Sequence, residues 1–294
     1  MHHEESVEQI RRLTAPLAPL PTGQTPRIES LAGIRAVLFD VYGTLVISGC
    51  GDIGLTDTQA SPDQFRQALD VAGVDTDALP EGFDGAAVLA EIIRSSHACA
   101  RRQGVDYPEV DILGIWDALL SRLDIKADQR MLRRSAIEYE FLSNAVWPMP
   151  GLGDLIDALT QRRLVLGIVS NAQFYTPLML NAFLGRDINA AGFYSRCCAW
   201  SYQHRVGKPS IRVFEPALAA LLRDYGIEPE QVLYIGNDLR NDIWPASQLG
   251  CLTALFAGDA RSLRLREGDP SLRDIHPDRV VTALDQITAH LLVR

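Results

Sequence analysis

The sequence predicts an α/β fold in which a Rossmann-like parallel sheet carries an inserted α-helical cap subdomain. Three observations lead to this prediction. Short apolar runs end at polar or glycine residues, helical patterns separate these runs, and a stretch of about 100 residues interrupts the alternation after the first run. With 294 residues the chain is long enough to bury a substantial core and still leave room for a cleft.

Four apolar runs are expected to form central strands of the sheet, because strands buried on both faces are short and almost continuously apolar. Helical patterns precede the second and the third run, and the later helix is expected to end at Gly226. Strands that alternate with helices indicate βαβ units, whose ligands bind beyond the carboxyl ends of the strands. The predicted strands are residues 34–41, 164–171, 231–238 and 252–258.

Residues 51–147 are too many for an ordinary crossover connection and are expected to form the helical cap over that edge of the sheet. Ser61 followed by Pro62 is typical of a helix start, and "WPMPG" at 147–151 is expected to be a stiff return hinge. Apolar residues at spacings of three and four predict cap helices over 61–73, 85–104, 110–123 and 128–142.

Residues 1–33 combine a short amphipathic piece with a proline-rich stretch that disfavours helix and suits an extended linker. This N-terminal arm is expected to pack on its own domain or on a second copy of the chain in a homodimer, and a flexible tail is the alternative. The catalytic core then comprises residues 34–50 and 148–294.

The composition excludes some classes of partner. Lys and Arg number 28 against 37 Asp and Glu, a formal net charge of −9, so the basic surface expected of a nucleic-acid-binding protein is missing. No apolar run approaches the ~20 residues that span a bilayer, and the polar N-terminus lacks the apolar segment of a signal peptide. The five cysteines show no CxxC spacing, which argues against a disulfide framework and a zinc ribbon. We therefore expect a cytoplasmic protein with a small-molecule substrate.

Asp40 stands at the end of the first predicted strand, where a buried carboxylate is costly unless it is paired, hydrogen-bonded or bound to a metal. An aspartate that merely caps a turn is the structural alternative. That alternative weakens because polar residues also end the other runs and are expected at the same edge of the sheet. These residues are Ser170 and Asn171, Lys208 in "GKPS", and Asn237, Asp238 and Asp242 in "GNDLRND".

Together these groups suit phosphoryl transfer through an aspartate nucleophile. An ionised aspartate can attack phosphorus at neutral pH, and the acyl phosphate that it forms is labile to water. The lysine offsets the charge that gathers between nucleophile and phosphate, while the hydroxyl and the amide hydrogen-bond phosphate oxygens. The acidic cluster would recruit Mg²⁺, which prefers oxygen ligands. The expected substrate is therefore a phosphate ester.

In this order the motifs "DVYGTL", "VSN", "GKP" and "GNDLRND" resemble those of the haloacid dehalogenase superfamily of hydrolases. The resemblance implies that Asp40 is the nucleophile and that Thr44 stabilises the loop after it. It also implies that Ser170 and Asn171 bind phosphate and that Lys208 offsets charge. "TLVISGCG" would be the flap of the site, and the cap would supply substrate selectivity.

The resemblance places Mg²⁺ on Asp40, the backbone carbonyl of Tyr42 and the acidic motif. The usual metal ligand beside the glycine of that motif is replaced by Asn237, so either its amide oxygen or the carboxylate of Asp238 would bind the ion. Asp242 is expected to orient the lysine or a metal-bound water.

Tyr42 is a second departure from the family pattern. Phosphatases of the family carry an aspartate there as the general acid for the leaving alcohol, and a tyrosine, with a pKa of about 10, is a poor base for activating water. The 2-haloacid dehalogenases of the family do have "YGTL" after their nucleophile, and a halide leaving group needs no proton. Against dehalogenation, their metal-free Ser-Ser-Asn motif is absent, and so is an arginine between residues 46 and 65. Asp238 and Asp242 beside Asp40 also gather negative charge that Mg²⁺ would relieve.

Three hypotheses follow from these residues. The first is a Mg²⁺-dependent phosphatase that acts on a small phosphorylated metabolite through an aspartyl-phosphate at Asp40. The second is a metal-independent 2-haloacid dehalogenase that works through an aspartyl ester. The third is a phosphate-binding protein with little turnover, because the general acid is missing.

Some charged, aromatic and sulfur-containing residues have no role in these hypotheses. The arginine-rich stretch at 258–269 could bind an anionic substrate, but it is expected to be a solvated loop. The cap arginines could also bind an anionic group. The tryptophans are expected to pack in the core or the hinge, and Cys197 and Cys198 to be small buried hydrophobes. The arginines are Arg101, Arg102, Arg133 and Arg134, and the tryptophans are Trp116, Trp147, Trp200 and Trp244.

Overall fold

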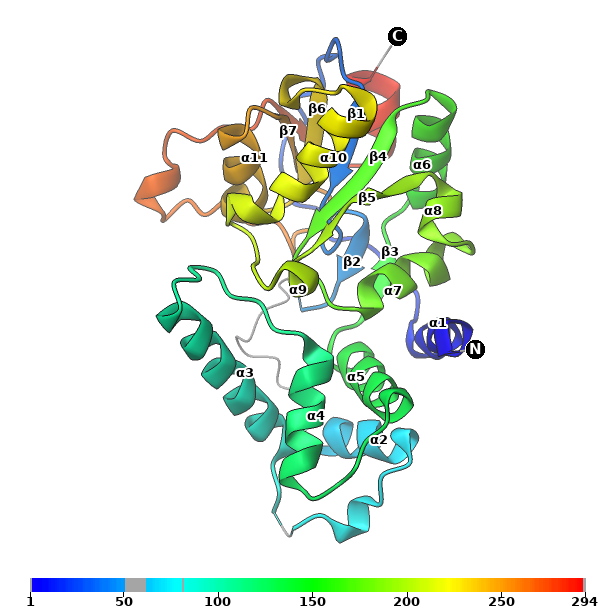
Figure 1. Ribbon diagram of the computed structural model, residues 1–294. Helices are drawn as coiled ribbons and strands as arrows, with labels where there is room; N and C mark the ends of the chain where they lie inside the picture. The colour runs from blue at the N-terminus through cyan, green and yellow to red at the C-terminus, as the bar shows by residue number, and fades with distance from the viewer. Residues whose placement is uncertain (1, 51–61, 81, 293–294) are drawn as a thin grey trace.

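A computed structural model describes residues 2–50, 62–80 and 82–292 of the protein. The predicted α/β fold is confirmed: in these residues six strands form one parallel sheet with helices on both faces (Figure 1). The strands are β1 (Ala36–Phe39), β4 (Val165–Ser170), β5 (Phe193–Trp200), β6 (Val232–Gly236), β7 (Leu252–Phe256) and β8 (Arg279–Val281). Their order across the sheet is β5-β4-β1-β6-β7-β8.

Strand β1 lies in the middle of the sheet, between β4 and β6. Its last residue, Phe39, pairs with Ile168 of β4 and with Ile235 of β6. Every residue of β1 is buried, because helices cover both faces of the sheet, which explains the continuously apolar run in the sequence. Asp40 therefore leaves the sheet at a point flanked by the carboxyl ends of two neighbouring strands.

Alternate residues of β1 face two separate hydrophobic clusters. Ala36 and Leu38 pack with α10 and α11 on one face, whereas Val37 and Phe39 pack with α6, α7 and α8 on the other (Figure 1). These helices are α6 (Leu152–Gln161), α7 (Tyr175–Leu184), α8 (Ile188–Ala191), α10 (Glu215–Tyr225) and α11 (Trp244–Gln248). The end of α10 at Gly226, which has a left-handed φ of 57°, confirms the predicted C-cap.

The four predicted central strands do not include β5 and β8, which lie at the two edges of the sheet. Ser195 and Arg196 of β5 are exposed and interrupt its apolar pattern, and β8 spans only Arg279–Val281. Cys197 and Cys198 lie within β5, the first buried and the second partly buried. Edge strands with one solvated side lack the continuous apolar run that identifies central strands.

The helices predicted between the first two central strands pack together on the side of the sheet where Asp40 emerges (Figure 1). Phe65 and Trp116 stack with ring centroids 5.5 Å apart, and Tyr139 meets both rings edge-on. We call this helical group the cap, and its boundaries at residues 51 and 147 stay a prediction. The predicted helix start at Ser61 lies outside the described residues. The cap helices are α2 (Pro62–Ala72), α3 (Gly85–Arg102), α4 (Ile112–Arg122) and α5 (Gln129–Ser143).

The chain enters and leaves the cap through an antiparallel ribbon. Strand β2 (Val46–Ser48) pairs with β3 (Val146–Pro148), so that Ile47 lies opposite Trp147. The amide of Met149 also donates to the carbonyl of Leu45 at 2.9 Å. The predicted return hinge at 147–151 therefore begins as a strand of this ribbon.

The N-terminal arm packs on its own chain. Helix α1 (His2–Leu13) lies against α7 of the core and α5 of the cap (Figure 1). Gln9 Nε2 donates to Glu138 Oε2 on α5 at 2.7 Å. The extended stretch that follows pairs Arg27 with Val280 of β8 through backbone hydrogen bonds of 2.8 and 3.1 Å.

A glycine in β4 allows this strand to pack closely against its neighbours β5 and β1. A Cβ added at Gly167 would lie 2.4 Å from the carbonyl oxygen of Cys197 and 2.6 Å from Leu38 Cδ2. Because one of these atoms belongs to the backbone, we expect Gly167→Ala to lower the free energy of unfolding by about 1–3 kcal/mol in urea denaturation. Gly153→Ala is the control: nothing lies within 4 Å of its Cβ in helix α6, so the variant should be unchanged or more stable by up to about 1 kcal/mol. Equal effects of the two substitutions would contradict this account.

Candidate active site

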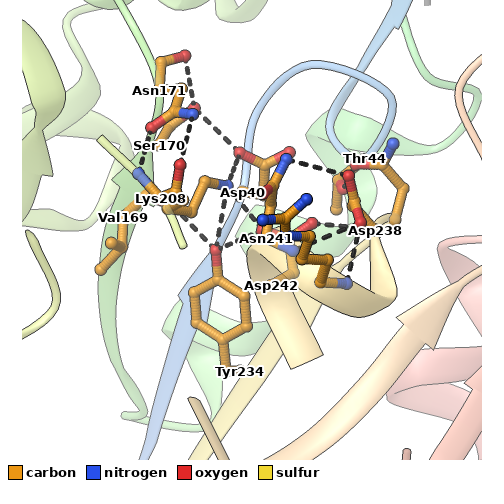
Figure 2. A network of polar contacts seen from close by, with 12 residues as sticks. Asp40, Thr44, Val169, Ser170, Asn171, Lys208, Tyr234, Asp238, Asn241 and Asp242 are labelled. Carbon is orange, nitrogen blue, oxygen red and sulfur yellow. Dashed lines mark hydrogen bonds and ion pairs between the residues drawn. The ribbon is translucent and has the colours of Figure 1, made fainter. Parts of the chain in front are cut away.

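Asp40, Lys208 and Asp242 form a buried ion-pair cluster beyond the end of β1 (Figure 2). Lys208 Nζ donates to Asp40 Oδ1 at 2.6 Å and to Asp242 Oδ1 at 2.5 Å. Lys208 comes from the segment after β5, and Asp242 from the short π-helix η4 (Leu239–Ile243) after β6. Burial lowers the pKa of Lys208, but Asp242 and Asp40 raise it by more, so the ammonium stays charged at neutral pH.

The hydroxyl of Ser170, at the end of β4, donates to the same oxygen of Asp40 at 2.9 Å. In the described chain both side-chain hydrogen bonds to Asp40 reach Oδ1, and Oδ2 receives none. Asn171, the next residue, binds the backbone of Lys208: its Oδ1 accepts from that amide at 2.7 Å. The structure therefore brings the predicted Ser170, Asn171 and Lys208 together around Asp40.

Tyr234 of β6 belongs to this cluster, although the sequence analysis did not single it out. Its hydroxyl lies 2.9 Å from the carbonyl oxygen of Val169 and 3.0 Å from Asp242 Oδ1, and its one proton can go to either (Figure 2). Burial raises the pKa of Tyr234 strongly, as do Asp242 and Asp40. A neutral phenol inside an apolar strand gives no pattern by which the sequence could have revealed it.

The loop after Asp40 is held by Thr44 and Asn237. Gly43 has a φ of +83°, and a Cβ there would lie 2.6 Å from Asn237 Nδ2. Thr44 Oγ1 donates to Asn237 Oδ1 at 3.2 Å, and Asn237 Nδ2 donates to the carbonyl of Ser262 at 2.5 Å. Thr44 is thus hydrogen-bonded to the residue expected as a metal ligand, and its role in stabilising the loop stays a prediction.

Asp238 and Asp242 have different partners. Asp242 Oδ2 accepts a hydrogen bond from the backbone amide of Asp238 at 2.9 Å, and Asp242 Oδ1 accepts one from Lys208 Nζ. The carboxylate of Asp238 begins η4 by accepting from two backbone amides, and it accepts from Arg266 Nη2 at 2.5 Å. The prediction of a solvated arginine-rich loop is therefore wrong at Arg266, which pairs with a buried carboxylate and neutralises it.

The hydroxyl of Tyr42 is hydrogen-bonded to a residue outside the Asp40 cluster. The hydroxyl lies 3.0 Å from Thr176 Oγ1 at the start of α7. Burial and Glu140 raise the pKa of Tyr42 far above its ordinary value, although the hydrogen bond to Thr176 lowers it. Tyr42 therefore keeps its proton at neutral pH and is unsuited to be a general base.

Comparison with known proteins identifies the family. The family model described as haloacid dehalogenase-like hydrolase matches residues 34–250. The chain is a haloacid dehalogenase-like hydrolase. No curated protein matches the chain by sequence.

Solved structures of such hydrolases are similar to this chain over most of its length. A 2-haloacid dehalogenase from Pseudomonas syringae pv. Tomato DC3000 is 18% identical, with a TM-score of 0.54 over 87% of this chain and 97% of that chain. A predicted phosphoglycolate phosphatase from Haemophilus somnus 129pt is 18% identical, with a TM-score of 0.47 over 88% and 99%. A HAD phosphatase from Thermococcus onnurineus is 18% identical, with a TM-score of 0.45 over 87% and 97%. Both phosphatases and dehalogenases thus occur among these neighbours.

A cavity of about 620 Å³ lies between the cap and the core of this hydrolase, and Lys208 and Asn171 line its core end. Glu109 and Glu140, which the sequence analysis did not single out, also line it. Burial raises the pKa of both carboxyls. A lone glutamate in an amphipathic helix is usually solvated, so the pattern of α5 gave no signal for Glu140.

In the described part of the chain no helix combines the length and apolar character needed to cross a membrane.

The pH dependence of stability should report the raised pKa of Glu140. A carboxyl with a raised folded pKa holds its proton more tightly in the folded protein, so this group makes the wild-type free energy of unfolding fall as pH rises above 4.5. Glu140→Gln removes that contribution, and the variant should gain stability relative to the wild type between pH 4 and pH 7. Urea denaturation at unit pH steps measures this difference. The exposed Glu267→Gln should show no such trend, and a flat difference for Glu140→Gln would contradict the prediction.

Proposed function

We propose that this hydrolase is a phosphatase that forms an aspartyl-phosphate on Asp40 and uses Mg²⁺. The observation that supports the proposal is the position of the Asp40 cluster beside the cavity: Lys208, which contacts Asp40, lines this cavity of about 620 Å³. A cavity of that volume suits a ligand of tens of atoms rather than a two- or three-carbon haloacid.

The residues of the cluster have distinct tasks in such a reaction. Oδ2 of Asp40 attacks phosphorus, the bond from phosphorus to the ester oxygen breaks, and the leaving alcohol takes a proton. Lys208 and Ser170 bind Oδ1 of the nucleophile, which orients the carboxylate for attack. The lysine also offsets the charge of the incoming phosphate. Water then hydrolyses the acyl phosphate and restores Asp40.

Glu140 is the residue that we assign to protonate the leaving alcohol in place of the aspartate absent at position 42. It lines the same cavity as Lys208, and Tyr175 donates to its Oε2 at 2.7 Å. General acid catalysis is worth about 10²- to 10⁴-fold, but only where the leaving group needs a proton. Glu140→Gln should therefore lower kcat about 10²-fold for an alkyl phosphate and only slightly for 4-nitrophenyl phosphate. An equal loss on both substrates would exclude this role.

The oxygen atoms near Asp40 could serve as ligands for Mg²⁺ if amide and carbonyl oxygens are counted together with carboxylates. In residues 2–50, 62–80 and 82–292 no three His, Cys, Asp or Glu side chains form a metal-binding group. Asp238 is engaged by Arg266, whereas Asn237 Oδ1 accepts one hydrogen bond, from Thr44. We therefore assign Asp40, the Tyr42 carbonyl and the amide oxygen of Asn237 as ligands, with Asp238 excluded. When bound, the ion would polarise the phosphate oxygens and offset their charge.

The proposal is tested by turnover of a panel of phosphate esters with added Mg²⁺ and with EDTA. We expect hydrolysis that EDTA abolishes and Mg²⁺ restores. Asn237→Ala should raise the Mg²⁺ concentration needed for half-maximal activity more than Asp238→Asn does. Absence of hydrolysis across the panel with Mg²⁺ present would refute the phosphatase.

A metal-independent 2-haloacid dehalogenase is the second candidate function. Two observations favour it: Tyr42 follows the nucleophile, and the Asp238–Arg266 pair reduces the negative charge that a metal would have to offset. Release of chloride from 2-chloropropionate in the presence of EDTA would establish this function. Phosphate release without chloride release would exclude it.

A further inference from the structure

Resting on the proposed function, we infer that Glu109 is a positioning residue: it docks the cap on the core segment that carries Lys208 and thereby holds Lys208 against Asp40. The inference starts from residues 103–111, which join α3 to α4 and which we call the cap connector. In Figure 1 the connector runs along the side of the cap that faces α9 (Ser201–His204) of the core.

The backbone of the connector pairs with the core directly before Lys208. The amide of Glu109 donates to the carbonyl of Arg205 at 3.1 Å, and the amide of Gly207 donates to the carbonyl of Tyr107 at 2.8 Å. These two hydrogen bonds form an antiparallel bridge between cap and core. Lys208 is the next residue along the chain, so its backbone is anchored from the cap as well as from the core. Lys208 is also the cation that would offset the charge of a phosphate.

The side chain of Glu109 ties this bridge to the core in two directions. Its Oε2 accepts from Ser201 Oγ at 2.9 Å, and its Oε1 accepts from Gln173 Nε2 at 3.3 Å. The other acceptor within reach of the Ser201 hydroxyl, the carbonyl of Ala172, lies farther away at 3.3 Å. Ser201 follows β5 and Gln173 follows β4, so one carboxylate joins the cap to the ends of two neighbouring strands. Both partners are buried, where a donor that loses its acceptor is costly.

Other contacts keep the connector near the core if Glu109 is removed. Arg205 Nη2 lies 3.2 Å from Asp111 Oδ2, but the two side chains are 58% and 30% exposed, and such a pair contributes little. Gln173 Oε1 accepts from the amide of Ile112, at the start of α4, at 2.9 Å. Loss of the Glu109 carboxylate should therefore loosen the connector and the Lys208 segment without unfolding the protein.

The chain has only two lysines, Lys126 and Lys208, so the position of Lys208 can be measured without turnover. The side chain of Lys208 is ion-paired and 4% exposed, whereas Lys126 is exposed. An amine reagent therefore reaches Lys208 only when it leaves Asp40, and the initial rate follows the population of that state. The measurement is the ratio of the acetylation rates of Lys208 and Lys126 with acetic anhydride, by peptide mass spectrometry.

Glu109→Ala should raise this ratio about tenfold, the change in population expected from the loss of one or two hydrogen bonds. Glu109→Gln, which keeps the shape and one acceptor, should raise the ratio by a smaller factor. The matched control is Glu91→Ala, which removes a cap glutamate whose ion pair with Arg122 lies within the cap. Gly167→Ala, which is expected to destabilise the core away from the connector, controls for global unfolding. Both controls should keep the wild-type ratio.

An unchanged ratio in Glu109→Ala, or a rise of the same size in Gly167→Ala, would overturn the inference. If Glu109→Ala does not fold, then an unchanged ratio in Glu109→Gln overturns it. Labelling needs no ester, so this failure is distinct from failure of the proposed function. A raised ratio in a protein that hydrolyses no ester would refute the phosphatase alone, and hydrolysis together with an unchanged ratio would refute only the role of Glu109.

Discussion

Replacing Asp40 with asparagine is expected to lower turnover by about 10⁴-fold or more, because removal of a nucleophile eliminates the covalent step. Asparagine has the same shape, and Lys208 would keep its contact with Asp242. The folded protein should therefore survive, with a free energy of unfolding within about 1 kcal/mol of the wild type. Steady-state kinetics on the best ester of the panel, together with urea denaturation, measures both effects.

The control for Asp40→Asn is the same change at an exposed aspartate, Asp285, which should leave kinetics and stability unaltered. Trapping adds a direct readout, since acid-quenched wild-type protein should carry phosphate that hydroxylamine removes and the variant should carry none. Turnover by the Asp40→Asn protein within tenfold of the wild type would show that Asp40 is not the nucleophile.

Replacing Lys208 with methionine is expected to destabilise the protein by about 3–5 kcal/mol as well as to inactivate it. The change leaves the buried carboxylates of Asp40 and Asp242 facing each other without a cation, and breaking a buried ion pair from one side costs about that much. The loss should be largest at neutral pH. Burial raises the pKa of Asp242 and Lys208 lowers it, so without the ammonium this pKa rises further in the folded state. The folded variant then binds more protons than its unfolded chain and recovers stability as pH falls towards 4.

A second substitution separates stability from chemistry at Lys208. Lys208→Met combined with Asp242→Asn removes one of the two facing charges and should recover most of the lost free energy of unfolding. The double variant should stay inactive, because no cation remains beside Asp40 to offset the charge of a phosphate. If stability does not recover, then the cost of Lys208→Met comes from lost packing rather than from unpaired charge.

The sequence predicted those parts of the fold whose physical cause is local. Central strands such as β1 are buried on both faces and therefore appear as continuous apolar runs, and cap helices show apolar residues at spacings of three and four. Strand β5 does not show such a run, because Arg196 and its neighbour are exposed to solvent at the sheet edge, and it is not among the four predicted central strands. The predicted meeting of Asp40 and Lys208 followed from the rule that parallel strands end at one edge.

The directions of side chains could not be predicted, because they depend on residues far away in the chain. Asp238 and Asp242 look alike in "GNDLRND", yet one pairs with Arg266 and the other with Lys208. Trp116 was expected in the core, and it is buried, but its unpartnered N–H depends on helices α2 and α5 closing around the ring. The roles of the site residues and the metal stay predictions.

The position of helix α1 bears on how quickly products could leave. The ribbon of β2 and β3 is a natural axis for rotation of the cap, but α1 packs on α5 of the cap and α7 of the core at once. Rotation must therefore break the Gln9–Glu138 hydrogen bond or carry α1 away from α7. Residues that do not line the cavity would in this way set the rate of its opening, and with it an upper limit on the number of turnovers per second.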